Sequence, residues 1–453
     1  MLGITNRRQF LLQAPLAAAA LLPGAKVFAA PALDANSVRR LASNVSGRVI
    51  TPQMPDYESS RQVFNRAFER YPALIVRCVV ASDVARSLAF AQSNNLQVAV
   101  RGGGHSRLGY GVCDGGIVID LSAMKRVEVD AGKRTARAEA GALVRDLDEA
   151  TQRFGLATTS GGCPTVGIAG LTLGGGEGRL MDKYGAACDN LLSAQVITVD
   201  GRQVEASADS KSSIPVTDVL SGSLIYPTGR IPELLEAFAR FLAAAPDEMD
   251  ALAQVLPSDS GRRLRMDLCY CGNLQTGRDL VRPLRALGPE NDTLRVVSYL
   301  EAQAAGGFLQ APVAHFQTNL FLRELGGAET AAIATAVNGA PASCKLVIVP
   351  LRGAISRVRV DATAFALRQP GYEVDVAGVW STPAEKAQVV RWVRDTRDRL
   401  WPFAHGVYVN QLGDTSEKLV KLAYGPNYAR LVEIKRKYDP RNVLRLNQNI
   451  PVA

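Results

Sequence analysis

The sequence predicts an α+β fold in two parts, and two observations lead to it. From Ala73 onward, short apolar and β-branched runs alternate with segments of helical periodicity. After Ser207 the composition shifts, and a second set of strand-like and helix-like segments begins. Short strands with intervening helices favour a two-lobed α+β domain followed by a second α+β region. A chain of 453 residues, 47% of them hydrophobic, is long enough for two domains with a core each.

The first region alternates expected strands with two expected helices. Strands are predicted at 73–80, 97–101, 117–121, 126–129, 135–139, 194–199 and 203–206. Helical periodicity predicts helices over 82–94 and 142–154, with Ser82 as the N-cap of the first and Asp83 in its first turn.

The second region is expected to be α+β as well. Helices are predicted over 231–244, around 276–286 and over 383–400, with a strand over 263–271. A last helix is expected over 419–438. It should end at Asp439-Pro440, because proline cannot continue a helix.

The first thirty residues differ from the rest of the chain. Arg7-Arg8 precede an apolar run from Leu16 to Leu22 and small residues up to Ala32, which is the layout of a twin-arginine export signal. The apolar run is too short to span a bilayer, and the alternative is an ordinary amphipathic helix. We expect segment 1–30 to be removed and the folded protein to be exported, periplasmic or secreted, by the twin-arginine machinery.

Charge, cysteine and histidine content exclude several classes of protein. The net charge of +9 falls by three, to +6, once Arg7, Arg8 and Lys26 leave with the signal, and the remaining Lys and Arg residues are scattered among acids. This pattern argues against nucleic-acid or membrane binding. Seven cysteines without repeated spacing form neither a disulfide framework nor a zinc pattern, and three histidines are too few for a multi-histidine metal centre. We therefore expect no metal site.

A first glycine-rich stretch follows a buried-type strand. Arg101 leads into Gly102, Gly103 and Gly104, and then into His105 and Ser106. Glycines at a strand end let successive backbone N–H groups turn toward an anion such as a pyrophosphate, with the histidine within reach of the bound molecule. No helix is expected after it, so this is not the G-x-G-x-x-G fingerprint. A flexible turn with an incidental histidine is the alternative.

A second glycine-rich stretch runs from Gly161 to Gly178. So much glycine beside apolar positions indicates backbone packed tightly against a flat or charged ligand. Cys163, held by Pro164, is a candidate for thiolate chemistry, although a lone cysteine is more often a small buried hydrophobe.

Taken together, these motifs resemble the FAD domain of the vanillyl-alcohol-oxidase (PCMH-type) superfamily, in its berberine-bridge-enzyme-like branch. The similar motifs are R-G-G-G-H-S at 101–106, G-G-C-P-T-V-G at 161–167, G-G-G-E-G at 174–178, K-Y-G at 183–185 and Asp189-Asn190. In the carboxy-terminal part they are Y-V-N at 408–410, Y-G-P-N-Y at 424–428, K-Y-D-P at 437–440 and N-Q-N-I at 447–450. The resemblance extends from about Tyr57 to the end of the chain.

The resemblance implies FAD bound covalently at two residues. It places the flavin 8α-methyl carbon on His105 and the flavin C6 on Cys163. Tyr408 is the implied general base, but its partner is not evident, because a phenol with a pKa near 10 needs help to take a proton at neutral pH. The positions expected to contact FAD are Arg101, Gly102, Gly103, Gly104, His105, Ser106, Cys163, Gly167, Gly170, Gly174, Gly175, Gly176, Gly178, Asn410 and Asn447.

The implied reaction is the oxidation of a bulky hydroxylated substrate, such as a sugar, an oligosaccharide or another alcohol. Hydride would pass to flavin N5, and dioxygen would reoxidise the flavin and give hydrogen peroxide; a dehydrogenase with another acceptor is the near alternative. The implied domains are a signal at 1–30, a two-lobed PCMH-type FAD domain at 31–219, and a substrate domain at 220–405 with an antiparallel sheet covered by helices. A segment at 406–453 would return to the FAD domain.

The sequence departs from the family pattern in two places. After Asp209 a helix and a strand of the FAD domain are missing, so either a shorter connection closes the lobe or an exposed sheet edge and a damaged pocket result. The second outcome would make the chain a non-catalytic flavin-binding protein. In addition, Glu177 and Arg179 stand where apolar residues are usual. They would either bind a polar substrate or pair with each other on the surface.

Overall fold

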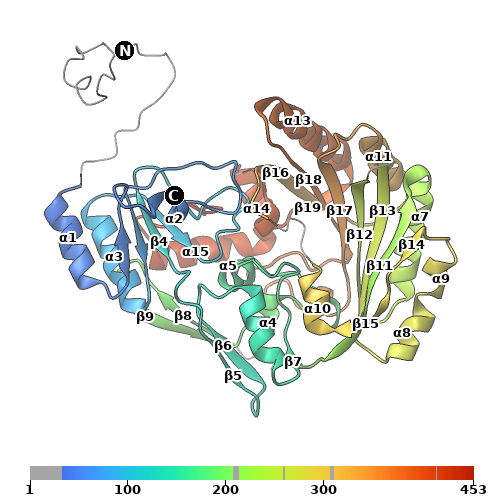
Figure 1. Cartoon of the computed structure of the whole chain (residues 1–453), viewed down its shortest axis with the longest axis horizontal. Helices are drawn as coiled ribbons and strands as arrows, with labels where there is room; N and C mark the ends of the chain where they lie inside the picture. Colours follow the sequence, from blue (N-terminus) through green and yellow to red (C-terminus); the bar gives the residue numbers. More distant parts are fainter. Residues whose placement is uncertain (1–32, 208–213, 259–260, 307–310, 415, 453) are drawn as a thin grey trace, which may run out of the picture.

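The computed structural model describes residues 33–207, 214–258, 261–306, 311–414 and 416–452, and the expected export signal at 1–30 lies outside them. Two α+β parts lie side by side (Figure 1). The amino-terminal part carries the small sheets, and a large sheet follows it in the chain. The predicted two-part α+β fold is confirmed.

The first lobe is built on a four-stranded sheet. Its strands are β1 (Arg48–Ile50), β2 (Leu74–Arg77), β4 (Ile117–Asp120) and β3 (Val98–Arg101), in the order β1-β2-β4-β3. Strand β4 runs parallel to both β2 and β3, while β1 is antiparallel to β2. Helices α1 (Ala35–Asn44) and α3 (Ala81–Ser93) supply Leu41 and Leu88 to the core on this sheet.

The prediction that Ser82 is the N-cap of helix α3 (Ala81–Ser93) is wrong. Val80 holds the cap position, and Ser82 lies inside the helix. The Asp83 carboxylate accepts hydrogen bonds from the backbone N–H groups of Val79 at 3.0 Å and Ser46 at 2.8 Å. The Asp83 side chain therefore fixes the start of the helix by accepting hydrogen bonds from backbone N–H groups that precede it, and a serine at the N-cap is not required.

The second lobe consists of hairpins around helix α4 (Val144–Gln152). The hairpins are β5 (Val127–Asp130) with β6 (Thr135–Ala138), and β8 (Ser193–Ile197) with β9 (Gln203–Ser207). A third pair joins β7 (Leu156–Ala157) to β10 (Ile214–Pro215). Strand β10 follows Asp209, the position after which a helix and a strand of the family pattern are predicted to be missing. The chain thus contacts this lobe once more before it enters the large sheet.

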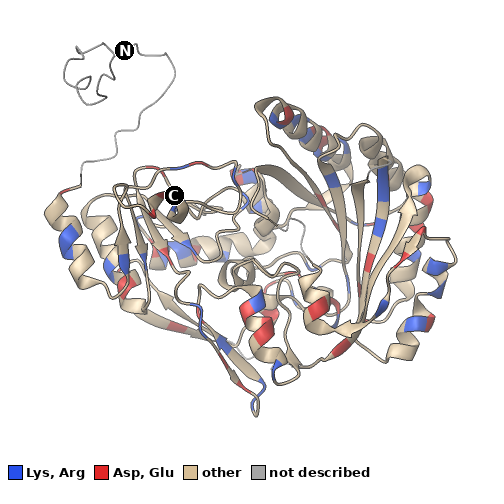
Figure 2. Ribbon diagram, in the orientation of Figure 1, with Lys and Arg blue, Asp and Glu red and all other residues tan. Residues whose placement is uncertain are grey.

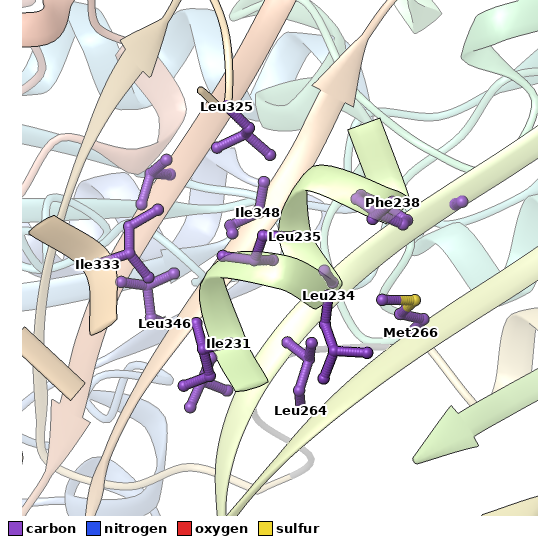
Figure 3. Close-up of a cluster of buried hydrophobic side chains, with 14 of the residues drawn as sticks. Ile231, Leu234, Leu235, Phe238, Leu264, Met266, Leu325, Ile333, Leu346 and Ile348 are labelled. Atoms are coloured by element: carbon purple, nitrogen blue, oxygen red, sulfur yellow. The ribbon is translucent and has the colours of Figure 1, made fainter. Parts of the chain in front are cut away.

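The second domain is built on a nine-stranded sheet within the described residues, and all its pairings are antiparallel. Its strands are β11 (Asp218–Pro227), β12 (Met249–Ser258), β13 (Gly261–Tyr270), β14 (Asn291–Asp292), β15 (Arg295–Ser298), β16 (His315–Leu322), β17 (Cys344–Leu351), β18 (Gly371–Val379) and β19 (Ala404–Gly406). Helices α7 (Ile231–Ala244), α11 (Gly327–Asn338) and α13 (Pro383–Leu400) cover one face, where Leu264, Met266, Leu346 and Ile348 pack under them (Figure 3).

The other face of the large sheet carries polar and charged side chains. Successive side chains of a strand point to opposite faces, so the apolar residues on either side of Asp375 in β18 pack under the helices while Glu373 and Asp375 point away from them. The same alternation places Arg265 and Asp267 of β13 on this second face. Figure 2 shows Lys and Arg interspersed with Asp and Glu over both domains.

The expected helix over 419–438 is wrong as a single element. It divides into α14 (Glu417–Tyr424) and α15 (Tyr428–Tyr438) at Gly425-Pro426, where Gly425 takes a positive φ of 48° and Pro426 offers no N–H. The expected helix around 276–286 divides likewise, into α8 (Leu274–Leu280) and α9 (Arg282–Arg285). Beyond α15, Val443 and Leu444 pack on the core of the first lobe.

The remaining helices are short. They are α2 (Tyr57–Ser60), α5 (Ile168–Leu173), α6 (Met181–Tyr184), α10 (Tyr299–Ala304) and α12 (Ala354–Arg357). Helix α5 lies inside the second glycine-rich stretch, where the sequence predicts only a loop. In the described part of the chain, none of the helices is long and apolar enough to cross a membrane.

Candidate active site

A cavity of about 820 Å³ lies where the two domains meet. Both glycine-rich stretches, the charged face of the large sheet and the carboxy-terminal segment line it. Most of the predicted site residues are brought together in its wall, namely Arg101, Gly102, Gly103, Gly104, His105, Ser106, Cys163, Gly167, Gly170, Gly174, Gly178, Tyr408, Asn410 and Asn447. A cavity of this size is typical of a small-molecule or cofactor site.

Gly175 and Gly176 are the two predicted positions that do not line the cavity. Both take positive φ values and sit behind the wall, where a Cβ on Gly175 would lie 2.5 Å from the Phe365 ring. Gly176 still reaches the site, because its backbone N–H donates to the Tyr408 hydroxyl at 2.9 Å.

The two glycine stretches meet through their backbones. A Cβ on Gly103 would lie 2.3 Å from the backbone nitrogen of Gly167, so this approach requires glycine. By contrast, a Cβ on Gly162 or Gly170 would meet nothing within 4 Å. The wall therefore offers bare backbone to the cavity, which fits a long, flat dinucleotide such as FAD with its pyrophosphate on peptide N–H groups.

His105 is held flat in this wall. Its ring stacks on Phe64 with centroids 3.8 Å apart. Burial, with smaller effects from Arg107 and His315, lowers the pKa of His105 to about 3. The imidazole is therefore neutral at neutral pH, which is the form that can act as a nucleophile. Cys163 is half-buried, and its Sγ lies 3.4 Å from the hydroxyl of Thr165.

The guanidinium of Arg101 is engaged by a neighbouring strand. It pairs with Asp120 at 3.0 Å, and Arg77 approaches the same carboxylate at 3.2 Å. This ion pair ties the ends of β3 and β4 together beneath the first glycine stretch.

Tyr408 is fixed by hydrogen bonds at both ends. Its hydroxyl oxygen accepts from the Gly176 N–H and from Asn410 Nδ2, both at 2.9 Å. Asn319 holds its backbone, accepting from the Tyr408 N–H at 3.3 Å. The side chain is buried, and burial, followed by the negative charges of Glu177 and Glu373, raises the pKa of Tyr408 well above its ordinary value. The phenol is therefore protonated at neutral pH.

Three carboxyl groups line the same cavity as Tyr408, and only one of them, Glu177, was considered from the sequence. Glu177 comes from the second glycine stretch, and Glu373 and Asp375 come from β18. Glu373 is 1% exposed and Asp375 is 6% exposed. Two acids at alternate positions of the otherwise apolar strand Gly371–Val379 were the available signal, because such a pair shares one face.

The predicted alternative that Glu177 and Arg179 pair with each other on the surface is wrong. Both side chains line the cavity, and the carboxyl groups that act on Arg179 are Asp250 and Asp267 of the large sheet, not Glu177. Asp267 accepts from Gln254 Nε2 at 2.6 Å and from Arg265 Nε at 3.0 Å. Donors and acceptors thus alternate over the part of the sheet that faces the cavity.

The comparisons with known proteins agree with this geometry. A family model described as an FAD binding domain matches residues 72–207, and one described as berberine and berberine like matches residues 407–451. The chain is 30% identical over 456 residues to (R)-6-hydroxynicotine oxidase of Paenarthrobacter nicotinovorans. This alignment covers 90% of this chain and 97% of the relative. It is 28% identical to the FAD-linked oxidoreductase YgaK of Bacillus subtilis, over 90% of this chain and 98% of the relative.

Solved structures share the whole fold. The 6-hydroxy-D-nicotine oxidase of Arthrobacter nicotinovorans superimposes with a TM-score of 0.82 at 26% identity, over 90% of this chain and 98% of the other. A xylooligosaccharide oxidase of Myceliophthora thermophila superimposes with a TM-score of 0.81 at 20% identity, over 92% of this chain and 99% of the other. Similarity at this level of identity shows the fold alone. Similarity along nearly the full length of several FAD-linked oxidoreductases confirms what the glycine and tyrosine motifs predicted: this chain belongs to the berberine-bridge-enzyme-like branch of the PCMH-type FAD-linked oxidoreductases.

Proposed function

We propose that the chain is an oxidase with FAD linked covalently to His105 and Cys163, acting on a bulky hydroxylated substrate with dioxygen as the electron acceptor. The observation that supports this proposal is that both nucleophiles and Tyr408 line one cavity with the bare glycine backbone. When bound, FAD supplies the hydride acceptor, and dioxygen then gives hydrogen peroxide. Two links would hold the flavin in a site open enough for a large substrate.

The protein's own part in the reaction is to hold the flavin and to move a proton. A neutral His105 imidazole suits attachment, because the nitrogen lone pair is free. Tyr408 is the proposed acceptor of the substrate's hydroxyl proton, since Gly176 and Asn410 donate to its oxygen and would stabilise negative charge there.

The charged face of the large sheet supports a polar substrate. Asp250 and Arg265 contribute charge to the cavity wall that the large sheet forms, and Gln254 adds an amide. Arg179, which follows the second glycine stretch, adds a positive charge from the first domain. Alternating donors and acceptors suit a molecule with several hydroxyl groups, such as a sugar or oligosaccharide. The relatives named above add hydroxynicotine and xylooligosaccharides to the panel of compounds worth testing.

A second candidate is a flavin-binding protein without turnover. The observation that favours it is the weak closure of the second lobe. Among the described residues, β10 joins β7 through only two residue pairs, and the hairpins β5–β6 and β8–β9 form separate two-stranded sheets. A dehydrogenase that uses a quinone or dye in place of dioxygen remains the near neighbour of the oxidase.

The first experiment is an absorbance spectrum of acid-precipitated protein, followed by mass spectrometry of the peptides that carry His105 and Cys163. Flavin colour in the pellet and flavin mass on both peptides are expected. Peroxide release on addition of a sugar or alcohol supports the oxidase, and reduction of a dye without peroxide supports the dehydrogenase. Colourless protein with two unmodified peptides would contradict covalent attachment.

Export is proposed from the sequence of segment 1–30. The expected mature protein lacks Arg7 and Arg8 and is found outside the cytoplasm. Replacing both arginines by lysine should leave the precursor inside the cell, and export of that variant at the wild-type level would contradict a twin-arginine route.

A further inference from the structure

Two buried amide side chains hold the loops that carry His105 and Cys163. Asn65 is 1% exposed and lies between α2 and β2, and Gln303 is 3% exposed and belongs to α10. Neither side chain lines the cavity, so neither is placed to touch a molecule bound there. Both join the first domain to the second through hydrogen bonds beside the two proposed flavin ligands.

Asn65 uses the full hydrogen-bonding capacity of its carboxamide. Its Nδ2 donates to the carbonyl oxygens of Arg107 at 2.9 Å and of His315 at 3.1 Å. Its Oδ1 accepts from the backbone N–H groups of His315 at 3.2 Å and of Ala67 at 3.0 Å. An amide offers two N–H donors and two acceptor lone pairs, so none is left over. His315 begins β16, and Asn65 therefore ties the loop after His105 to the large sheet.

Phe64, the residue before Asn65, completes the support of His105. Its ring stacks on the imidazole with centroids 3.8 Å apart, and its backbone N–H donates to the carbonyl of Gly104 at 3.1 Å. The histidine is thus held before and after it along the chain, and on one face of its ring. Because Asn65 is bonded to β16, the position of the imidazole depends on how the second domain docks.

Gln303 holds the loop before Cys163 from the second domain. Its Nε2 donates to the carbonyl oxygen of Gly161 at 3.1 Å and to the carboxylate of Asp148 at 3.0 Å. The backbone just beyond α10 approaches the same loop closely. A Cβ on Gly306 would lie 2.1 Å from the carbonyl oxygen of the residue before Cys163. The position of the thiol therefore also depends on the second domain, through contacts separate from those at His105.

We propose that Asn65 is the positioning residue for the flavin link at His105 and Gln303 the one for the link at Cys163, an inference that rests on the proposed covalent attachment of FAD. Each bond that forms removes one C–H proton of the flavin and the N–H or S–H proton of the nucleophile. The two electrons pass through the flavin to dioxygen, which takes up both protons and gives hydrogen peroxide. A displaced nucleophile reacts slowly, because a shift of about 1 Å can cost about 100-fold in rate.

The test is mass spectrometry of the peptides that carry His105 and Cys163, from full-length wild type and from Asn65→Leu, Gln303→Met and Asn427→Leu. Leucine and methionine remove the amide with little change in side-chain volume. Asn427 provides the matched control, because it is a buried amide, 8% exposed, that donates to two backbone carbonyl oxygens outside the cavity wall.

The two variants are expected to lose different links. N65L should lower the flavin-modified fraction of the His105 peptide by about tenfold or more while the Cys163 peptide stays modified, and Q303M should do the reverse. N427L should match the wild type at both peptides. Wild-type occupancy of both peptides in N65L and Q303M would overturn the proposal, as would the joint loss of both links in either folded variant. Asn65→Asp, which loses the two donations, and Gln303→Asn, which is too short for them, serve if a first variant does not fold.

Hydrogen exchange of the same proteins gives a readout that needs no flavin. N65L should speed backbone exchange over 101–107 and leave 160–163 unchanged, and Q303M should show the opposite pattern. Wild-type protein without flavin on either peptide defeats the proposed covalent attachment, and the exchange rates then decide whether the two amides hold these loops. Wild-type exchange in both stretches of both variants would contradict the positioning roles.

Discussion

The backbone N–H of Gly176 donates to the hydroxyl of Tyr408 at 2.9 Å, across 232 positions of the chain. This contact ties the second glycine stretch to the carboxy-terminal segment at the edge of the cavity. Asn410 donates to the same oxygen and also to the carbonyl of Leu171, so the tyrosine and the wall of the cofactor site are held as one unit.

Replacing Tyr408 by phenylalanine should therefore separate chemistry from cofactor binding. We expect Y408F to retain flavin and to lose about 100-fold or more in the rate of substrate oxidation, because the phenol oxygen is removed while the ring still packs on Phe365. The Gly176 N–H then lacks its acceptor, which costs about 1–3 kcal/mol of stability. Single-turnover kinetics and flavin content measure the two effects, and a wild-type rate in Y408F would exclude Tyr408 as the proton acceptor.

Single and double substitutions of the two proposed flavin ligands have a distinct expected pattern. Cys163→Ala and His105→Ala should each retain flavin in the acid pellet through the remaining link, and the double variant should release it. Because Cys113 is buried outside the cavity wall, Cys113→Ala is the control for the loss of a thiol. Flavin release from either single variant, with the other peptide unmodified, would show that only one residue forms a bond.

The positions of the glycine, histidine and cysteine residues could be predicted from the sequence because they lie in short motifs with fixed spacing. Nearly all of them reach one cavity wall. Most strands of the first region, the strand over 263–271 and the long helices Ile231–Ala244 and Pro383–Leu400 were also predictable, since apolar periodicity reflects which face is buried. The other strands of the large sheet were not predicted.

The placement of Glu177, Glu373 and Asp375 in one cavity wall was not predictable from local patterns. Glu177 and Glu373 share this wall only because the large sheet folds against the second glycine stretch, an arrangement that no sequence spacing encodes. Helix α5 was missed because its six residues are too few for a periodic pattern and include Gly170. The break at Gly425-Pro426 was visible in the sequence, but the amphipathic pattern on either side favoured one continuous helix.

Folding stability should fall as pH rises from about 4 to about 6, in part through Asp250. Burial raises the pKa of Asp250 from 3.8 to about 6, so over this range the folded protein keeps a proton that the unfolded chain has lost. The stability from this group is complete below the unfolded pKa and is lost as pH rises through the folded pKa. Asp250→Asn should make the melting temperature less sensitive to pH in this window.

The exposed Asp361 provides the control for that measurement, because its pKa is lowered, not raised. Asp361→Asn should leave the decline in melting temperature from about pH 4 to pH 6 in place. A D250N variant with the wild-type slope would mean that Asp250 is ionised in the folded protein at pH 5.

Two glycine substitutions should distinguish backbone packing from space for the cofactor. Gly103→Ala places a Cβ against the backbone of Gly167, so the two glycine stretches must separate, and we expect a loss of about 1–3 kcal/mol in stability together with loss of flavin. Gly170→Ala meets no protein atom within 4 Å and lies in helix α5, so the flavin-free protein should be at least as stable as the wild type. Its methyl group projects from the cavity wall, and flavin incorporation should therefore fall. Thermal melts and flavin absorbance on both variants separate the two effects. Full flavin loading in G170A would show that the cofactor does not lie against this turn of α5. Wild-type stability in G103A would contradict the tight backbone contact between the two glycine stretches.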